Sequence, residues 1–168
     1  MKSAYQDVVD EVRILKGIEE AIAIAIERER EARKFYLYNS TLMENPKFKE
    51  LYEYLASEEL KHLGCLEKCR DTKELPVVRT KVHSDQSLTS EFNPARTKGS
   101  EITLGDTGIL LAAMRHERKN EDFYSELAKQ VEDNAQRSFF EMLSRYERAH
   151  YELIDGYLDY VTGFRMQT

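Results

Sequence analysis

The chain has 168 residues, of which 41% are hydrophobic and 33% are charged, with 7 glycines and 3 prolines. This balance is typical of a helix-rich protein, and we expect one domain over residues 1–168. The net charge of −6 argues against nucleic-acid binding, which needs a concentrated basic surface. The longest apolar run, Ala21 to Ile26, is far shorter than the roughly 20 residues of a membrane span, and no signal peptide opens the chain. We therefore expect a cytoplasmic protein that makes no membrane contact.

Helical periodicity and turn residues divide the chain into four predicted helices. Asn45 and Pro46 mark a helix start, because asparagine is a favourable cap and proline fits the first helical position. Further along, Pro76, Pro94 and Gly99 interrupt the periodic pattern and indicate a connection. The predicted helices span about residues 8–40, 46–70, 104–132 and 134–161, and residues 71–103 form a long crossover.

The order of short, long and short connections predicts an all-α four-helix bundle built from two helical hairpins joined by the crossover. The two hairpins are also related by an internal repeat. When the chain is shifted by 88 residues, residues 16–69 align with residues 104–157 without a gap, and 11 of 54 positions are identical. The repeat preserves polar residues at positions where helix geometry predicts a core. Polar residues repeated at core positions of both hairpins point to a functional site inside the bundle.

Each predicted hairpin contributes one lone glutamate and one Glu-x-x-His pair. The lone glutamate sits on the apolar stripe of the first helix of its hairpin. The pair is three residues apart on the second helix, so both side chains project from one face. The shift of 88 superposes the two sets, which consist of Glu29, Glu59 and His62 in the first hairpin and Glu117, Glu147 and His150 in the second.

Four buried glutamates would repel one another and lose hydration, at a cost of several kcal/mol per ion. Protonation could neutralise them, but two divalent cations balance four negative charges more completely. Carboxylates with one imidazole per metal suit iron or manganese. A single Glu-x-x-His motif more often lies on a solvated helix face, whereas two in register, each with its own lone glutamate, predict a two-metal site.

Other polar and aromatic residues allow two interpretations. Tyr36 and Tyr124 lie two turns after Glu29 and Glu117, where they could hydrogen-bond to ligand carboxylates or simply pack in the core. The repeat places Leu153 and Tyr157 opposite the two cysteines, so we interpret Cys65 and Cys69 as small core residues. We assign Phe35 and Phe123 to the hydrophobic core. The sequence suggests no partner for His83 or His116.

Four sequence segments resemble the rubrerythrin-related branch of the ferritin-like superfamily. The segments AIAIAIEREREARKFY and LAAMRHERKNEDFY are similar to its ligand helices, and EELKHL and YERAHYEL to its Glu-x-x-His helices. The resemblance implies a ferritin-like four-helix bundle with a non-haem centre of two iron ions that reacts with hydrogen peroxide or oxygen, commonly in a homodimer. The implied ligands are Glu29, Glu59, His62, Glu117, Glu147 and His150, with Glu59 and Glu147 bridging the metals.

The sequence departs from classical rubrerythrins in two ways. Asn120 occupies the position of a seventh ligand, a glutamate, which puts efficient peroxidase activity in question. The Cys-x-x-Cys pairs of a rubredoxin domain are also missing, so electrons are expected from an external donor such as a rubredoxin. Three alternatives stay open at this stage: a ferroxidase or iron-handling protein, a di-manganese catalase-like enzyme, and an interaction module with a vestigial site.

Overall fold

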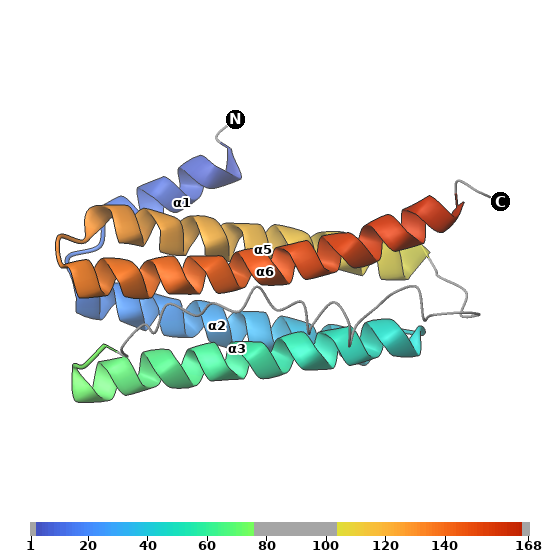
Figure 1. Cartoon of the computed structure of the whole chain (residues 1–168), viewed down its shortest axis with the longest axis horizontal. Helices are drawn as coiled ribbons and strands as arrows, with labels where there is room; N and C mark the ends of the chain where they lie inside the picture. The colour runs from blue at the N-terminus through green and yellow to red at the C-terminus, as the bar shows by residue number, and fades with distance from the viewer. Residues whose placement is uncertain (1–2, 76–103, 166–168) are drawn as a thin grey trace.

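The computed structural model describes residues 3–75 and 104–165, and every regular element in these ranges is a helix. Two long antiparallel hairpins lie on one another, and a short helix packs outside them (Figure 1). The elements are α1 (Ala4–Arg13), α2 (Ile18–Ser40), α3 (Pro46–Thr72), α5 (Leu104–Gln130) and α6 (Asn134–Arg165). The predicted all-α, ferritin-like bundle is confirmed. The predicted crossover lies largely outside the described residues.

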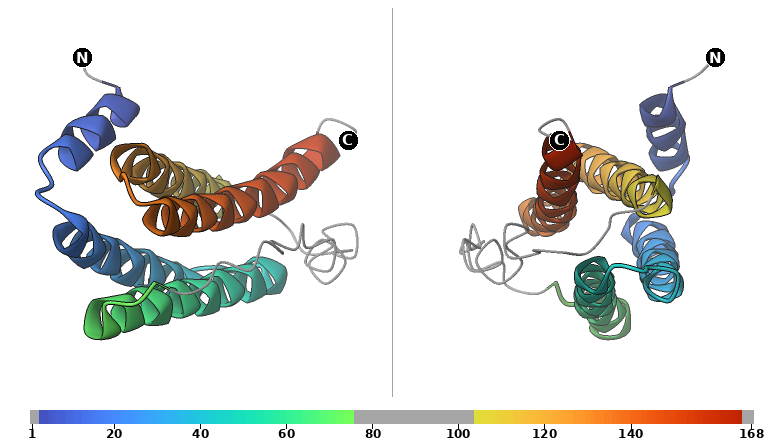
Figure 2. Two further views of the ribbon diagram at one scale, coloured as in Figure 1. Left: turned by 60° about the vertical axis from the view of Figure 1, so that its left-hand side comes forward. Right: turned by 90° about the vertical axis from the view of Figure 1, so that its right-hand side faces the viewer.

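The prediction of one continuous helix over residues 8–40 is wrong. Helix α1 ends at Arg13, and α2 begins at Ile18 after an extended Gly17. Glycine is a poor helix former and adopts this backbone conformation readily. The break lets α1 turn back and pack against α5, on the outside of the bundle (Figure 2).

The other helix boundaries follow from local capping. The side chain of Asn45 accepts a hydrogen bond from the backbone N–H of Lys47 at 2.9 Å, which fixes the start of α3 at Pro46. Helix α3 ends at Thr72, and its C-cap residue, Lys73, has a left-handed conformation with φ of 59°. At the start of α6, Asp133 accepts from the backbone N–H of Gln136 at 2.8 Å. Compared with the predicted bounds, α3 ends two residues later, α5 ends two residues earlier and α6 ends four residues later.

The bundle has two hydrophobic clusters rather than one continuous core. In an end-on view, α2 and α3 form one layer and α5 and α6 the other (Figure 2). The cluster near the α5–α6 turn is built around residues such as Leu66, Phe123 and Phe139. The second cluster, toward the other end, contains Leu51 and Ile154. The predicted polar residues of the repeat belong to neither cluster, although they are as deeply buried.

None of the helices in the described part of the chain combines the length and apolar character that a membrane crossing requires.

Candidate metal centre

The six polar residues that the repeat singled out come together in the middle of the bundle. The four glutamates have no exposed surface, and the two histidines expose 5% or less. All four bundle helices contribute. The residues are Glu29 from α2, Glu59 and His62 from α3, Glu117 from α5, and Glu147 and His150 from α6.

These side chains form two overlapping groups of candidate metal ligands. The first contains Glu29, Glu59, His62 and Glu147, and the second contains Glu59, Glu117, Glu147 and His150. Within each group, one donor atom from every residue lies within 4.8 Å of the others. Glu59 and Glu147 belong to both groups, and a ligand that bridges two metals requires this placement.

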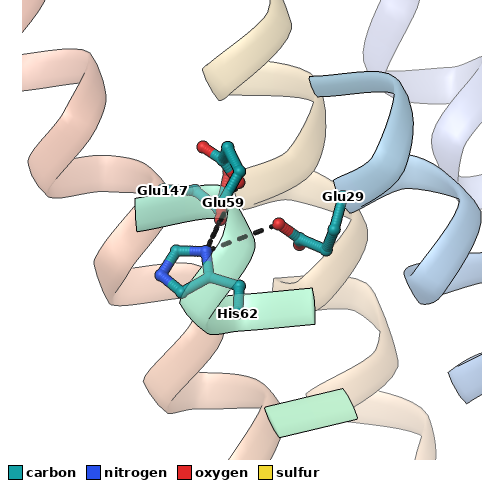
Figure 3. Close-up of side chains that lie close together, drawn as sticks. All are labelled: Glu29, Glu59, His62 and Glu147. Carbon is teal, nitrogen blue, oxygen red and sulfur yellow. Dashed lines mark ion pairs between the residues drawn. The ribbon is translucent and has the colours of Figure 1, made fainter. Parts of the chain in front are cut away.

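The imidazoles direct Nδ1 toward carboxylates from several helices. His62 Nδ1 lies 3.2 Å from Glu147 Oε1 and 3.4 Å from Glu29 Oε2 (Figure 3). His150 Nδ1 lies 3.2 Å from Glu59 Oε1. The two imidazole rings stack with centroids 5.4 Å apart and planes inclined by 15°. Each half of the repeat therefore presents the same nitrogen atom to the shared carboxylates.

Burial and mutual repulsion strongly perturb the pKa values of this cluster. Burial raises the pKa of Glu29 to about 8, and the neighbouring Glu59 carboxylate adds to the effect. Burial, together with Glu59 and Glu29, also raises the pKa of Glu147 well above its ordinary value. Burial opposes ionisation of Glu59 too, but contacts with His150 and His62 hold its pKa well below the usual range. The metal-free cluster thus keeps protons that cations would replace.

The pKa values of the two buried histidines are raised, whereas burial alone would lower them. Burial alone would lower the pKa of His62, but the carboxylates of Glu147 and Glu29 raise it well above its ordinary value. The pKa of His150 is raised in the same way, chiefly by contact with Glu117 and Glu59. Positive charge at these positions is therefore strongly favoured by the carboxylates around them.

The donor atoms fit two divalent metal ions. Unpaired buried polar atoms are costly and uncommon in folded proteins. Here they concentrate at one place and point toward a common centre, which is the arrangement that metal ligands need. The atoms without a hydrogen-bond partner among the described residues include Glu29 Oε2, Glu117 Oε2, both carboxylate oxygens of Glu59 and of Glu147, and Nδ1 of His62 and His150.

The two tyrosines that the sequence placed near the site donate hydrogen bonds across it. Tyr36 donates to Oε1 of Glu117, and Tyr124 donates to Oε1 of Glu29. Both tyrosines are fully buried, and burial raises the pKa of Tyr124 well above its ordinary value, so that its hydroxyl keeps its proton. The structure shows both arrangements that the sequence allowed, since each tyrosine packs in a hydrophobic cluster and also donates a hydrogen bond to a glutamate of the opposite half of the repeat.

The cysteines and His116 lie outside the cluster. Cys69 is buried in a hydrophobic cluster, and burial raises the pKa of its thiol to about 11, which disfavours the reactive thiolate. Cys65 is partly buried against the same cluster. His116 stacks on Phe35 with ring centroids 5.5 Å apart, a partner that the sequence did not suggest. His83 lies outside the described residues.

Sequence reasoning missed Tyr146 and Arg28, and it did not predict the contact that Asn120 makes with Arg28. Tyr146 stacks on His62 with ring centroids 5.2 Å apart. Arg28 donates a hydrogen bond of 3.2 Å to Asn120, which is 1% exposed. These contacts join different helices, and spacing along one helix does not reveal them. The available signal was the charge of Arg28 directly before a ligand candidate, Glu29.

An all-helical bundle with two overlapping carboxylate–imidazole groups in its interior is the arrangement of ferritin-like metal-binding proteins. The sequence model of the Rubrerythrin family matches residues 20–158. The chain therefore belongs to the rubrerythrin family. Searches of curated proteins and of solved structures gave no significant match.

Proposed function

We propose that this protein is a di-iron oxidoreductase that reduces hydrogen peroxide or oxygen with electrons from an external donor protein such as a rubredoxin. The observation that carries the proposal is the pair of buried donor groups that share Glu59 and Glu147. Membership of the rubrerythrin family supports it. We further propose that the protein works as a cytoplasmic homodimer, as the family resemblance implies.

In this proposal, each metal has one imidazole, one terminal carboxylate and two shared carboxylates. Glu29 and His62 serve the first metal, and Glu117 and His150 serve the second. Glu59 and Glu147 belong to both donor groups and would be shared between the two metals. Iron suits this donor set, and manganese is an alternative because the same ligand types accept both. When bound, two ferrous ions supply the two electrons that, with two protons, convert one hydrogen peroxide to two waters.

The protein residues contribute order and exclusion of water. The hydrogen bonds from Tyr36 and Tyr124 each occupy one oxygen of a terminal carboxylate and leave the other free for a metal. This fixes the orientation of the ligand and increases its affinity. The hydrophobic clusters on both sides keep bulk water out and so strengthen the electrostatic interactions within the site.

Asn120 favours a second candidate function. Its side chain supplies no carboxylate, and its oxygen accepts from Arg28. A centre with six ligands rather than seven suits oxidation of ferrous iron for storage or delivery, or a di-manganese catalase-like reaction. The proposed peroxide or oxygen reductase is preferred because the family match covers most of the chain.

Metal content is the first measurement. The protein would be reconstituted anaerobically with ferrous iron and manganese in competition. About two irons per chain are expected, and rapid mixing of the reduced protein with peroxide or oxygen would then identify the oxidant. Two manganese ions would favour the catalase-like alternative, and absence of both metals would contradict the proposal. The mass in gel filtration would separate a homodimer from an iron-storing cage.

A further inference from the structure

A cavity of about 580 Å³ lies on the outer side of the seam where α2 and α5 meet. We call it the seam cavity. Helix α1 contributes Glu11 to its wall, and Ala23 of α2 lies exposed at its rim. Its remaining polar lining comes from Glu27, Arg28 and Glu31 of α2 and from His116, Lys119 and Asn120 of α5. Both halves of the internal repeat therefore form it.

The lining of the seam cavity includes residues that neighbour the candidate metal ligands in the sequence. Arg28 and His116 are equivalent in the repeat, and each directly precedes one of the terminal glutamates. Asn120 lies one helical turn after Glu117, on the same face of α5. It lines the cavity although it is 1% exposed, so it forms the boundary between cavity and core.

The boundary carries polar atoms that lack partners. Asn120 Nδ2, Arg28 Nε and His116 Nδ1 are buried without a hydrogen-bond partner among the residues that the structure describes. The hydrogen bond between Arg28 and Asn120, at 3.2 Å, is at the long end of the normal range. A small molecule that both donates and accepts hydrogen bonds could pair with these atoms and compete for that bond.

Charge balance selects the kind of molecule. The cavity carries three carboxylates, Glu11, Glu27 and Glu31, and two cationic groups, and one of these, Arg28, is paired with Glu11. The positive groups disfavour a metal cation and the carboxylates disfavour an anion. The polar floor gives no advantage to apolar oxygen. An uncharged molecule with both donor and acceptor groups fits this lining best.

We propose that the seam cavity is the site through which hydrogen peroxide reaches the metal centre, with Arg28 and Asn120 as its inner wall. The inference rests on the proposed function, since it names the route and the preferred oxidant of the same centre. In this proposal, Asn120 favours hydrogen peroxide through a hydrogen bond, although its side chain has no carboxylate with which to bind a metal.

Blocking the rim gives the first test. Ala23→Trp places a large side chain at the mouth of the seam cavity, and Ala149→Trp is the matched control on an exposed alanine of α6. Rapid mixing of the reduced di-iron protein with hydrogen peroxide is expected to show a second-order rate constant at least about tenfold lower for Ala23→Trp, because access is obstructed. The control should stay within about twofold of the wild type. The rate with oxygen should be unchanged in both variants.

A second test does not depend on iron. In metal-free, ¹⁵N-labelled protein, the side-chain amide resonances of Asn120 are expected to shift in a saturable way as hydrogen peroxide is added. Ala23→Trp should suppress the shift and Ala149→Trp should not. Asn120→Leu, which removes the hydrogen-bonding group, should slow oxidation by peroxide.

The outcomes separate this inference from the proposed function. If peroxide oxidises the wild type and the Ala23→Trp variant equally fast, the seam cavity is not the route, but the proposed oxidoreductase function is not contradicted. If peroxide fails to oxidise the wild-type iron at all, the proposed function is wrong for this oxidant. The amide titration then decides alone whether the cavity binds peroxide, and the absence of a shift overturns the inference.

Discussion

Tyr36 on α2 donates its hydrogen bond to Glu117 on α5, in the other half of the repeat. The reciprocal bond runs from Tyr124 on α5 to Glu29 on α2. Each hairpin therefore orients the lone glutamate of the other. The exchange couples the two layers of the bundle at the depth where the candidate metal ligands lie.

Removal of one of these hydroxyl groups should weaken metal binding. Tyr36→Phe frees the carboxylate of Glu117, and loss of such a supporting hydrogen bond typically lowers metal affinity by about 10–100-fold. A competition titration against a chelator measures this. Tyr52→Phe is the matched control, because Tyr52 is equally buried but donates to the backbone oxygen of Ile109 at 2.8 Å. Equal losses of affinity in the two variants would contradict the role of Tyr36.

The shared carboxylates predict an asymmetry in metal stoichiometry. Glu59 belongs to both donor groups, whereas Glu29 belongs to one. Glu59→Ala should therefore abolish binding of both metals, and Glu29→Ala should leave about one metal per chain. Elemental analysis after reconstitution checks both values. Glu58→Ala serves as the control, since Glu58 pairs with Lys61 on the surface of the same helix. Two metals retained in Glu59→Ala would refute the shared arrangement.

The metal-free protein should become less stable as the pH rises. The folded-state pKa of Glu29 is raised to about 8 from 4.5, and that of Glu147 is raised as well. Between the unfolded and folded values, the folded protein binds more protons, so the free energy of unfolding falls with increasing pH. The raised pKa values of His62 and His150 act in the same direction above their ordinary 6.5. Glu59 acts oppositely, because its lowered pKa stabilises the fold above about pH 4.5 and is lost below it.

The check is the melting temperature of chelator-treated protein between about pH 6 and pH 9, which should decrease across this range. Glu29→Gln should flatten the decrease, because this residue then releases no proton. With metals bound, the trend should reverse, since cations replace the protons and bind more tightly as the pH increases. A melting temperature of the metal-free protein that rises with pH would show that the carboxylates are not protonated in the fold.

Helix α1 should contribute to stability through a single buried face. Val12 is fully buried, whereas Ile14, just beyond the end of α1, is 74% exposed. Val12→Ala is expected to lower the free energy of unfolding by about 1–3 kcal/mol, and Ile14→Ala to change it by less than about 0.5 kcal/mol. Urea denaturation of both variants tests this. Similar values for the two would mean that α1 is not held on α5 as the structure describes.

The sequence predicted the bundle and the six clustered residues because both depend on spacing within one helix and on the repeat. The wrong prediction over residues 8–40 has a local cause, since the apolar pattern of the sequence continues through Gly17 but the helix is interrupted there. Spacing along a single helix could not predict the contacts between different helices. The spacing of Tyr36 from Glu29 gave the correct depth, but not the carboxylate on the facing helix to which Tyr36 donates.

The exchange of tyrosines between the two halves has an evolutionary consequence. One hairpin carries two glutamates, one histidine and a tyrosine that finds its acceptor only on another hairpin. Two identical copies of such a hairpin could complete each other, whereas one copy could not. A chain of this kind can arise by duplication of a gene for a self-associating hairpin, followed by fusion of the copies. The two halves of the present chain differ at equivalent positions, such as Arg28 and His116, as separate evolution of fused copies would allow.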